Sequence, residues 1–254
     1  MTHLTSCLPD GRLLLYVWFE AMHTRIDMMF CTDLPENLVL DMARDIEEGT
    51  YRIERWGSCF LAGSEVSLIN TAPIGEFTQV SDELCRLLSD CVIYSEKTGG
   101  IFDIMVSEKK PGIPLKEKLT VDIHKGAVCR LKDGFTIDLS GLLKGYALDQ
   151  AMKNVKERGI TDALLSFGNS SISACGNHPN GKGWPVAYED DESGTFVLYD
   201  ECLTTSGNNT AKRVHIIDPR TGEAVTGKRK VSVRTSSGEE GEVLATVKFI
   251  TTNS

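Results

Sequence analysis

The chain has 254 residues, of which 41% are hydrophobic, enough for one large domain or two small ones with a proper core. Asp and Glu number 36 against 27 for Lys and Arg, which gives a formal net charge of -9. This charge opposes extended contact with phosphate backbones or anionic lipid, so we expect neither nucleic acid nor a membrane surface as a partner.

The first apolar run, "LLLYVWF" at 13–19, predicts a strand, because seven residues fall far short of the roughly 20 that cross a bilayer. We expect no membrane span in this chain. The segment "LTSC" at 4–7 imitates a lipoprotein cleavage box, but no apolar stretch precedes it. The sequence as written therefore predicts a cytoplasmic protein, and an exported or periplasmic one if a leader has been removed.

Three segments have the periodicity of amphipathic helices. The first runs from about residue 35 to 55, the second covers 82–97, and the third follows Ser140 and ends at Gly159, as a C-terminal glycine should. The buried faces are expected to contain Val39, Met42, Ala43 and Ile46 in the first helix and Leu84, Leu87, Leu88, Cys91 and Val92 in the second.

From about residue 161 onward, short β-rich runs alternate with Gly, Asn and Pro clusters. The connections are too short for crossover helices, so the strands should be mostly antiparallel. We therefore predict a single α+β domain over 1–254, with helices packed on mostly antiparallel sheets.

Two segments between the helices are less regular. In "TGGIFDIMV" at 98–106, paired glycines end a helix and Asp103 interrupts an apolar strand. The segment 107–120, with two prolines and four lysines, is predicted to be a solvated surface loop.

Common catalytic motifs are missing from the sequence. It has no GxSxG elbow, no HExxH zinc helix and no GxGxxG turn. The sequence therefore does not indicate an α/β-hydrolase, a zinc metalloprotease or a Rossmann-type dinucleotide-binding protein. The eight cysteines are scattered singly, without a CxxC pair. They are expected to be reduced thiols that mostly fill the core.

A strand-to-helix junction at 137–150, "IDLSGLLKGYALDQ", combines groups suited to an anion. Asp138 ends the strand, Ser140 can cap, and Lys144 lies one turn into the helix. Free N–H groups and the positive end of the helix dipole favour phosphates there, and the lysine adds a full charge. The alternative is an ordinary capped amphipathic helix.

Seven segments taken in order resemble the ApbE-like family, the FAD:protein FMN transferases. They are "SEVSLIN", "TGGIFDI", "IDLSGLLKGYALDQ", "LLSFGNSSISACG", "LTTSGN", "HIIDPRTG" and "EVLAT", and the match spans about 20–247. The resemblance implies a single domain related to the T-fold, with a C-terminus shorter than usual. It also implies an enzyme that uses Mg²⁺ to transfer the FMN half of FAD to a Thr or Ser hydroxyl of an acceptor protein, with release of AMP.

The resemblance also implies roles for particular residues. Lys144 and His215 would be catalytic, His215 by orienting phosphates or relaying the acceptor's proton, although a histidine that merely satisfies a strand end is an equal alternative. The metal would be held by the carbonyl of Gly141 and the side chains of Glu242 and Thr246, which share a helix face at i and i+4. FAD would contact Phe60, Ile101, Phe102, Asp103, Asp138, Lys144 and Ile216.

Three departures from the family pattern leave other functions open. Glu242 stands where aspartate is usual, Phe30 stands where many members have glycine, and the chain stops eight residues after Thr246. A site in which water replaces the acceptor would make the protein an FAD pyrophosphatase that yields FMN and AMP. A site without turnover would make it a non-catalytic FAD-binding protein.

Overall fold

The computed structural model describes residues 1–187, 195–208, 216–227 and 229–252. The chain forms two compact units, and each is assembled from three segments. The first unit comprises Met1–Ile53, Lys144–Thr205 and Ser232–Glu242, and the second comprises Glu54–Leu143, Ser206–Val231 and Val243–Ser254. The single domain expected over 1–254 stays a prediction.

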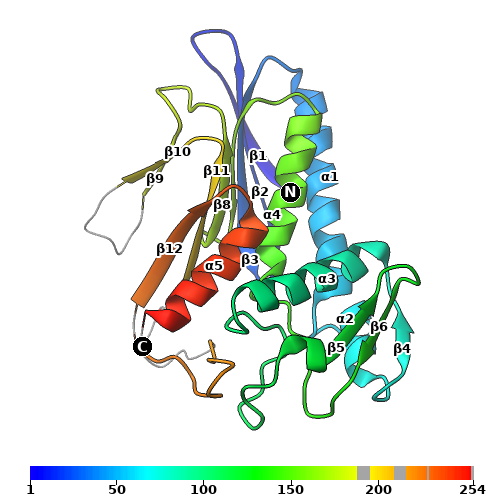
Figure 1. Ribbon diagram of the computed structural model, residues 1–254. Helices are drawn as coiled ribbons and strands as arrows, with labels where there is room; N and C mark the ends of the chain where they lie inside the picture. Colours follow the sequence, from blue (N-terminus) through cyan, green and yellow to red (C-terminus); the bar gives the residue numbers. More distant parts are fainter. Residues whose placement is uncertain (188–194, 209–215, 228, 253–254) are drawn as a thin grey trace. The chain divides into compact units, whose positions relative to one another are not determined.

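The first unit is built on a sheet with the strand order β1-β2-β3-β7-β8-β11-β12 (Figure 1). The register is antiparallel from β1 through β11, as the short connections predicted. These strands are β1 (Thr2–Cys7), β2 (Leu13–Ala21), β3 (Thr24–Thr32), β7 (Asp162–Phe167), β8 (Ser171–Cys175), β11 (Glu201–Asn208) and β12 (Arg229–Thr235).

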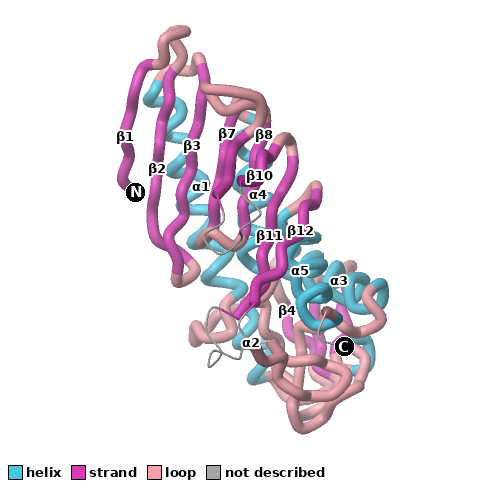
Figure 2. Tube along the Cα trace, turned by 90° about the vertical axis from the view of Figure 1, so that its left-hand side faces the viewer, coloured by secondary structure: helices cyan, strands magenta, loops and turns pink. Residues whose placement is uncertain are grey.

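Helices α1 (Glu36–Gly57) and α4 (Leu143–Glu157) lie on one face of this sheet, behind the strands in Figure 2. Val39, Met42, Ala43 and Ile46 of α1 are buried as predicted. Part of the opposite face is covered by the antiparallel hairpin strands β9 (Trp184–Ala187) and β10 (Thr195–Leu198). Their Trp184, Val186 and Leu198 pack with Ile172, Ala174 and Leu203 of the sheet.

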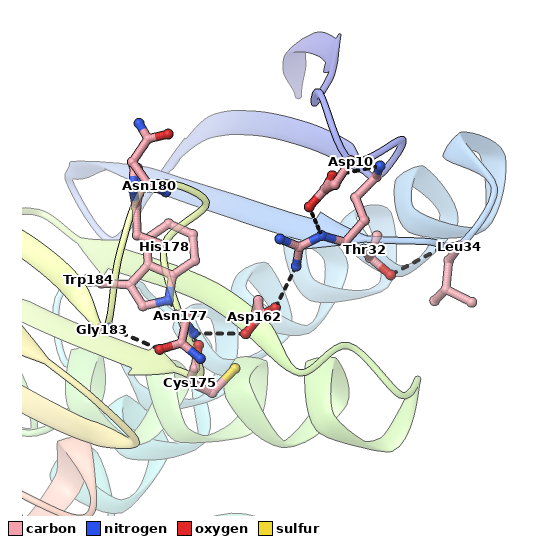
Figure 3. A network of polar contacts seen from close by, with 11 residues as sticks. Asp10, Thr32, Leu34, Asp162, Cys175, Asn177, His178, Asn180, Gly183 and Trp184 are labelled. Atoms are coloured by element: carbon pink, nitrogen blue, oxygen red, sulfur yellow. Dashed lines mark hydrogen bonds and ion pairs between the residues drawn. The ribbon is translucent and has the colours of Figure 1, made fainter.

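A polar network fixes one end of this sheet (Figure 3). Arg12 donates to Asp10 at 2.8 Å and to Asp162 at 2.9 Å, which ties the β1–β2 turn to the start of β7. Asp162 also accepts a bond from the backbone N–H of Asn177 at 2.7 Å, and the Asn177 side chain accepts from the N–H of Gly183 at 3.1 Å. These contacts provide hydrogen-bond partners for backbone N–H groups of the loops that are not paired within the sheet.

The second unit contains a three-stranded antiparallel sheet of order β4-β6-β5 with short helices beside it. Arg130 of β6 is buried and donates to the carbonyls of Ile69, Ala72 and Phe135 at 2.7 to 3.1 Å. The elements are α2 (Glu65–Thr71), β4 (Phe77–Gln79), α3 (Asp82–Lys97), the 3₁₀ turn η1 (Leu115–Glu117), β5 (Leu119–Asp122) and β6 (Ala127–Arg130).

The final helix, α5 (Gly238–Thr251), begins in the first unit and continues in the second. In the second unit, Phe249 and Ile250 pack with Val225. None of the described helices is long and apolar enough to span a membrane.

The structure confirms the α+β class, the three helices and the antiparallel strands. All eight cysteines are free and six are buried, as expected. Three local predictions are wrong. The 98–106 segment contains no strand after α3, and the residues that lead to Asp138 form an irregular segment instead of a strand. The segment 107–120 is not solvated throughout, because Leu115, Lys118 and Leu119 are buried.

Candidate functional site

A buried carboxylate, that of Glu242, lies at the start of α4 in the first unit. Only 6% of the residue is exposed. Its Oε1 accepts a hydrogen bond from Ser171 Oγ at 2.5 Å, and the backbone N–H of Gly145 also donates to it. Glu242 therefore occupies the position where the free N–H groups of a helix start favour negative charge.

The strand register explains why a hydroxyl meets this carboxylate. Ile172 and Ala174 of β8 pack toward the β9–β10 hairpin, and successive side chains of a strand point to opposite faces. Ser171 consequently points to the helix-covered face, together with its cross-strand partner Thr204.

Lys144 is connected to Glu242 through two serine hydroxyls. Its Nζ donates to Ser170 Oγ at 2.6 Å, the Ser170 and Ser171 hydroxyls are 3.5 Å apart, and Ser171 donates to Glu242. A cation and an acid are thus held in one polar cluster, and the phosphate contact expected of Lys144 stays a prediction.

Burial raises the pKa of Glu242 to about 7, because the ionised form loses its hydration. The charge of Lys144 and the Ser171 hydrogen bond act in the opposite direction, and the nearby Asp149 carboxylate raises the pKa further. The cluster therefore contains an acid that is only partly ionised near neutral pH.

Asp149 of α4 caps the first turn of α5. Its Oδ1 accepts from the N–H of Gly238 at 2.6 Å, and its Oδ2 accepts from the N–H of Glu239 and from Ser237 Oγ, both at 2.9 Å. A carboxylate that satisfies two otherwise unpaired N–H groups stabilises a helix start. Sequence reasoning did not identify Asp149, since an acid inside an amphipathic helix gives no sign of its partner.

Two glycines allow α4 and α5 to touch at this point. A Cβ added at Gly145 would lie 2.3 Å from the Gly238 carbonyl oxygen and 2.6 Å from Glu242 Cγ, and one at Gly238 would lie 2.8 Å from the Gly145 oxygen. Only residues without a side chain allow this approach.

Thr204 adds a buried hydroxyl beside the cluster. The residue is fully buried, and within the described part of the chain its Oγ1 has no hydrogen-bond partner. A Cβ added at Gly241 would lie 2.2 Å from this oxygen. Sequence reasoning did not single out Thr204, because the family resemblance assigned no role to a residue of its "LTTSGN" segment.

In the second unit, Asp138 stands at the end of an irregular segment held by Asn70. The Asn70 side chain donates to the Ile137 carbonyl at 2.9 Å and accepts from the Ile137 N–H at 2.7 Å. Asp138 accepts from the N–H of Ser140 at 2.8 Å, and Gly141 follows in an exposed position.

Cys59 is another residue that sequence reasoning missed. Its thiol hydrogen-bonds to Asp138, and burial together with this carboxylate raises the pKa of Cys59 to about 11. The thiol is therefore a neutral donor to Asp138 rather than a nucleophile.

The side chains of Phe102 and Asp103 are engaged inside the second unit. Phe102 is 4% exposed and packs edge-on against Tyr94. Asp103 pairs with the buried amine of Lys118 at 2.5 Å, and Lys118 also donates to the Met105 carbonyl. The structure thus shows packing and ion-pair contacts at these two positions, and their contact with FAD stays a prediction.

The remaining predicted residues of the second unit fall in different surroundings. Ile101 and Ile216 both pack against the apolar cluster of Val225, Phe249 and Ile250. Phe60 is 76% exposed, and the Thr246 hydroxyl lies 3.4 Å from that of Ser206.

The structure therefore brings Lys144 and Glu242 together in the first unit and Ile101 and Ile216 together in the second. Asp138, Gly141 and Thr246 belong to the second unit, and a common site with Glu242 stays a prediction. His215 lies outside the described residues.

Glu242, Gly141 and Thr246 offer oxygen ligands, which suit a hard divalent cation, but they do not form a complete set of protein ligands around a metal. Among the described residues, no group of three His, Cys, Asp or Glu side chains could hold a metal. Mg²⁺ is typically bound through one or two carboxylates together with substrate phosphates, and Glu242 is a buried carboxylate of that kind.

The chain is similar to several flavin-transferring proteins. It is 24% identical over 233 residues to the FAD:protein FMN transferase of Chlamydia pneumoniae, covering 80% of this chain and 73% of that protein. It is 32% identical over 157 residues to the enzyme of that name from Rhodobacter capsulatus, covering 57% and 29%. The matched stretch is thus less than a third of the latter.

Solved structures share the fold. The flavinyl transferase ApbE of Pseudomonas stutzeri in its apo form superimposes with a TM-score of 0.79 at 20% identity, covering 93% of this chain and 83% of that one. The flavin transferase ApbE of Vibrio cholerae gives a TM-score of 0.79 at 18% identity, covering 94% and 87%. The ApbE family model matches residues 22–254, further toward the C-terminus than the seven segments reach, and the chain therefore belongs to the ApbE family.

Proposed function

We propose that this protein transfers the FMN moiety of FAD to a Thr or Ser hydroxyl of an acceptor protein and releases AMP. The match of the ApbE family model over residues 22–254 carries this proposal. Relatives named FAD:protein FMN transferase support it. In the reaction, the acceptor oxygen bonds to the phosphorus on the FMN side, and the bond from that phosphorus to the AMP oxygen breaks.

The charges of the first unit suit this chemistry. Phosphoryl-type transfer needs positioning and neutralisation of the phosphate oxygens, and Lys144 at the start of α4 offers both a full charge and the positive end of a helix. His215 is our proposed acceptor for the proton of the attacking hydroxyl.

Glu242, the Gly141 carbonyl and the Thr246 hydroxyl are the groups that we propose to hold Mg²⁺. A bound divalent cation would supply charge neutralisation on the pyrophosphate. The burial of Glu242 supports this role. Its carboxylate loses hydration in the fold and is only partly ionised near neutral pH, and a bound divalent cation would stabilise the ionised form.

In the second unit, we propose that Asp138, Ile101, Ile216 and Phe60 contact FAD through their side chains. The Phe102 and Asp103 side chains are engaged internally. We therefore propose that these two residues meet FAD through their backbone.

The test is AMP release from FAD and Mg²⁺ with and without an acceptor protein that carries a known flavinylation segment. We expect AMP and protein-bound flavin only when the acceptor is present. Glu242→Ala should abolish turnover, while Glu157→Ala, which removes an exposed acid of α4, should not. AMP without acceptor would instead indicate an FAD pyrophosphatase, and retained FAD without AMP would indicate a binding protein.

A further inference from the structure

We propose that Asp149 is a positioning residue for the Glu242 carboxylate, and that it acts by fixing the start of α5 against α4. This inference rests on the proposed metal role of Glu242. Asp149 itself is engaged by α5 and is not proposed to touch substrate or metal.

Asp149 accepts three hydrogen bonds from residues at the start of α5. Two come from the first backbone N–H groups of α5, those of Gly238 and Glu239, and one comes from Ser237 Oγ. Ser237 Oγ in turn accepts from the N–H of Glu240 at 3.2 Å. One α4 carboxylate thus determines where α5 begins.

Glu242 lies four residues after Gly238, which places it about one helical turn, roughly 5 to 6 Å, further along α5. The side chains at i and i+4 share a face of the helix. The face that Asp149 caps is consequently the face from which Glu242 reaches Ser171 and the Gly145 N–H.

Each of the two helices therefore places a carboxylate at the start of the other. Asp149 of α4 caps the start of α5, and Glu242 of α5 accepts a hydrogen bond from the start of α4. The contact between Gly145 and Gly238 leaves no space for an adjustable side chain, so a shift of the α5 start displaces Glu242 directly.

If Asp149 acted on Glu242 only through its charge, the two substitutions of Asp149 would have equal effects on metal affinity. Asp149 is a like charge that opposes ionisation of Glu242, while its negative charge also attracts a cation. Asn removes the charge but keeps one carbonyl acceptor, whereas Ala removes both. Comparing Asp149→Asn with Asp149→Ala therefore separates hydrogen bonding from charge.

The experiment measures Mn²⁺ binding to the full chain with FAD by the EPR signal of free Mn²⁺, together with the Mg²⁺ dependence of turnover. For Asp149→Ala, we expect the Mn²⁺ dissociation constant and the Mg²⁺ half-saturation to rise at least tenfold. The kcat at saturating Mg²⁺ should stay within threefold of the parent, and Asp149→Asn should recover part of the affinity. Lys153→Ala, an exposed position one turn along α4, is the matched control and should bind as the parent does.

Equal losses in the Asn and Ala variants would overturn the inference, as would unchanged Mn²⁺ affinity with a reduced kcat. If Asp149→Ala fails to fold, Ser237→Ala removes one of the three hydrogen bonds to Asp149, together with the acceptor for the Glu240 N–H, and should still weaken Mn²⁺ binding two- to fivefold. An unchanged Mn²⁺ affinity in that variant would contradict the inference.

The inference and the proposed function can fail separately. A parent protein that binds Mn²⁺ with FAD but transfers no FMN contradicts the function, and the variants still decide the role of Asp149. A parent protein that transfers FMN while all Asp149 variants bind Mn²⁺ normally contradicts the inference alone. A parent that binds no Mn²⁺ contradicts the inference as well.

Discussion

At the scale of single residues, Glu242 couples protonation to folding. Its pKa is about 7 in the folded protein against 4.5 for an ordinary glutamate. Because the folded pKa is raised, the stability that this group contributes is fully present below pH 4.5 and is lost as the pH rises through 7. The ionised form is the one that a metal requires, so in the metal-free protein the contribution of Glu242 to stability should be lost above neutral pH.

We therefore predict that Glu242→Gln flattens the pH dependence of stability. In EDTA, the parent should lose about 2 kcal/mol more of its free energy of unfolding than the variant between pH 5 and pH 8. Urea unfolding at the two pH values provides the measurement. Parallel losses in both proteins would show that Glu242 does not titrate in this range.

Lys118 shows what residue-scale reasoning from sequence misses. Its segment has the prolines and lysines of a surface loop, yet its amine is buried with Asp103 and lies 4.9 Å from the centre of the Phe135 ring. Burial lowers the pKa of Lys118, while Asp103 opposes the shift. A buried charge of this kind is retained only with a partner, and the partner lies 15 residues away in sequence.

At the scale of elements, the contact between α4 and α5 depends on glycine. Helix periodicity predicted α4, but periodicity describes one helix at a time and cannot reveal which backbone will press against it. The structure shows that Gly145 lies where the backbones of α4 and α5 approach each other closely.

We expect Gly145→Ala to destabilise the protein by at least 1–3 kcal/mol, because its Cβ would overlap backbone atoms that cannot move aside. The control is Gly49→Ala in α1, where a Cβ meets nothing within 4 Å. That change should stabilise by about 0.5–1 kcal/mol through helix propensity. Thermal or urea unfolding of both variants tests the pair, and equal effects would contradict the close approach.

At the scale of the whole molecule, neither unit is a continuous stretch of chain. Each unit takes three segments, and the boundaries fall inside α1, at the first residue of α4, and inside β11, β12 and α5. Helix α5 contributes its first residues to one unit and Val243, Ala245, Phe249 and Ile250 to the buried core of the other. Both units therefore need this helix to be complete.

Removal of α5 should abolish cooperative unfolding of both units, since each loses buried contacts. Circular dichroism during heating is the measurement. The matched deletion is residues 2–7, which form the fully exposed edge strand β1; it should leave one cooperative transition with a modestly lower midpoint. A normal transition without α5 would show that the helix is dispensable.

The sequence by itself determined that helices lie at about 35–55 and at 82–97, that the strands are antiparallel and that the chain belongs to the ApbE family. These features follow from local periodicity, turn residues and ordered motifs, which are all written along the chain. Only the tertiary structure decided that Ser171 meets Glu242, that Asp149 caps α5 and that Lys118 is buried. Each of these contacts joins residues that are 13 to 90 positions apart, and their partners are set by strand register and helix packing, which no local pattern encodes.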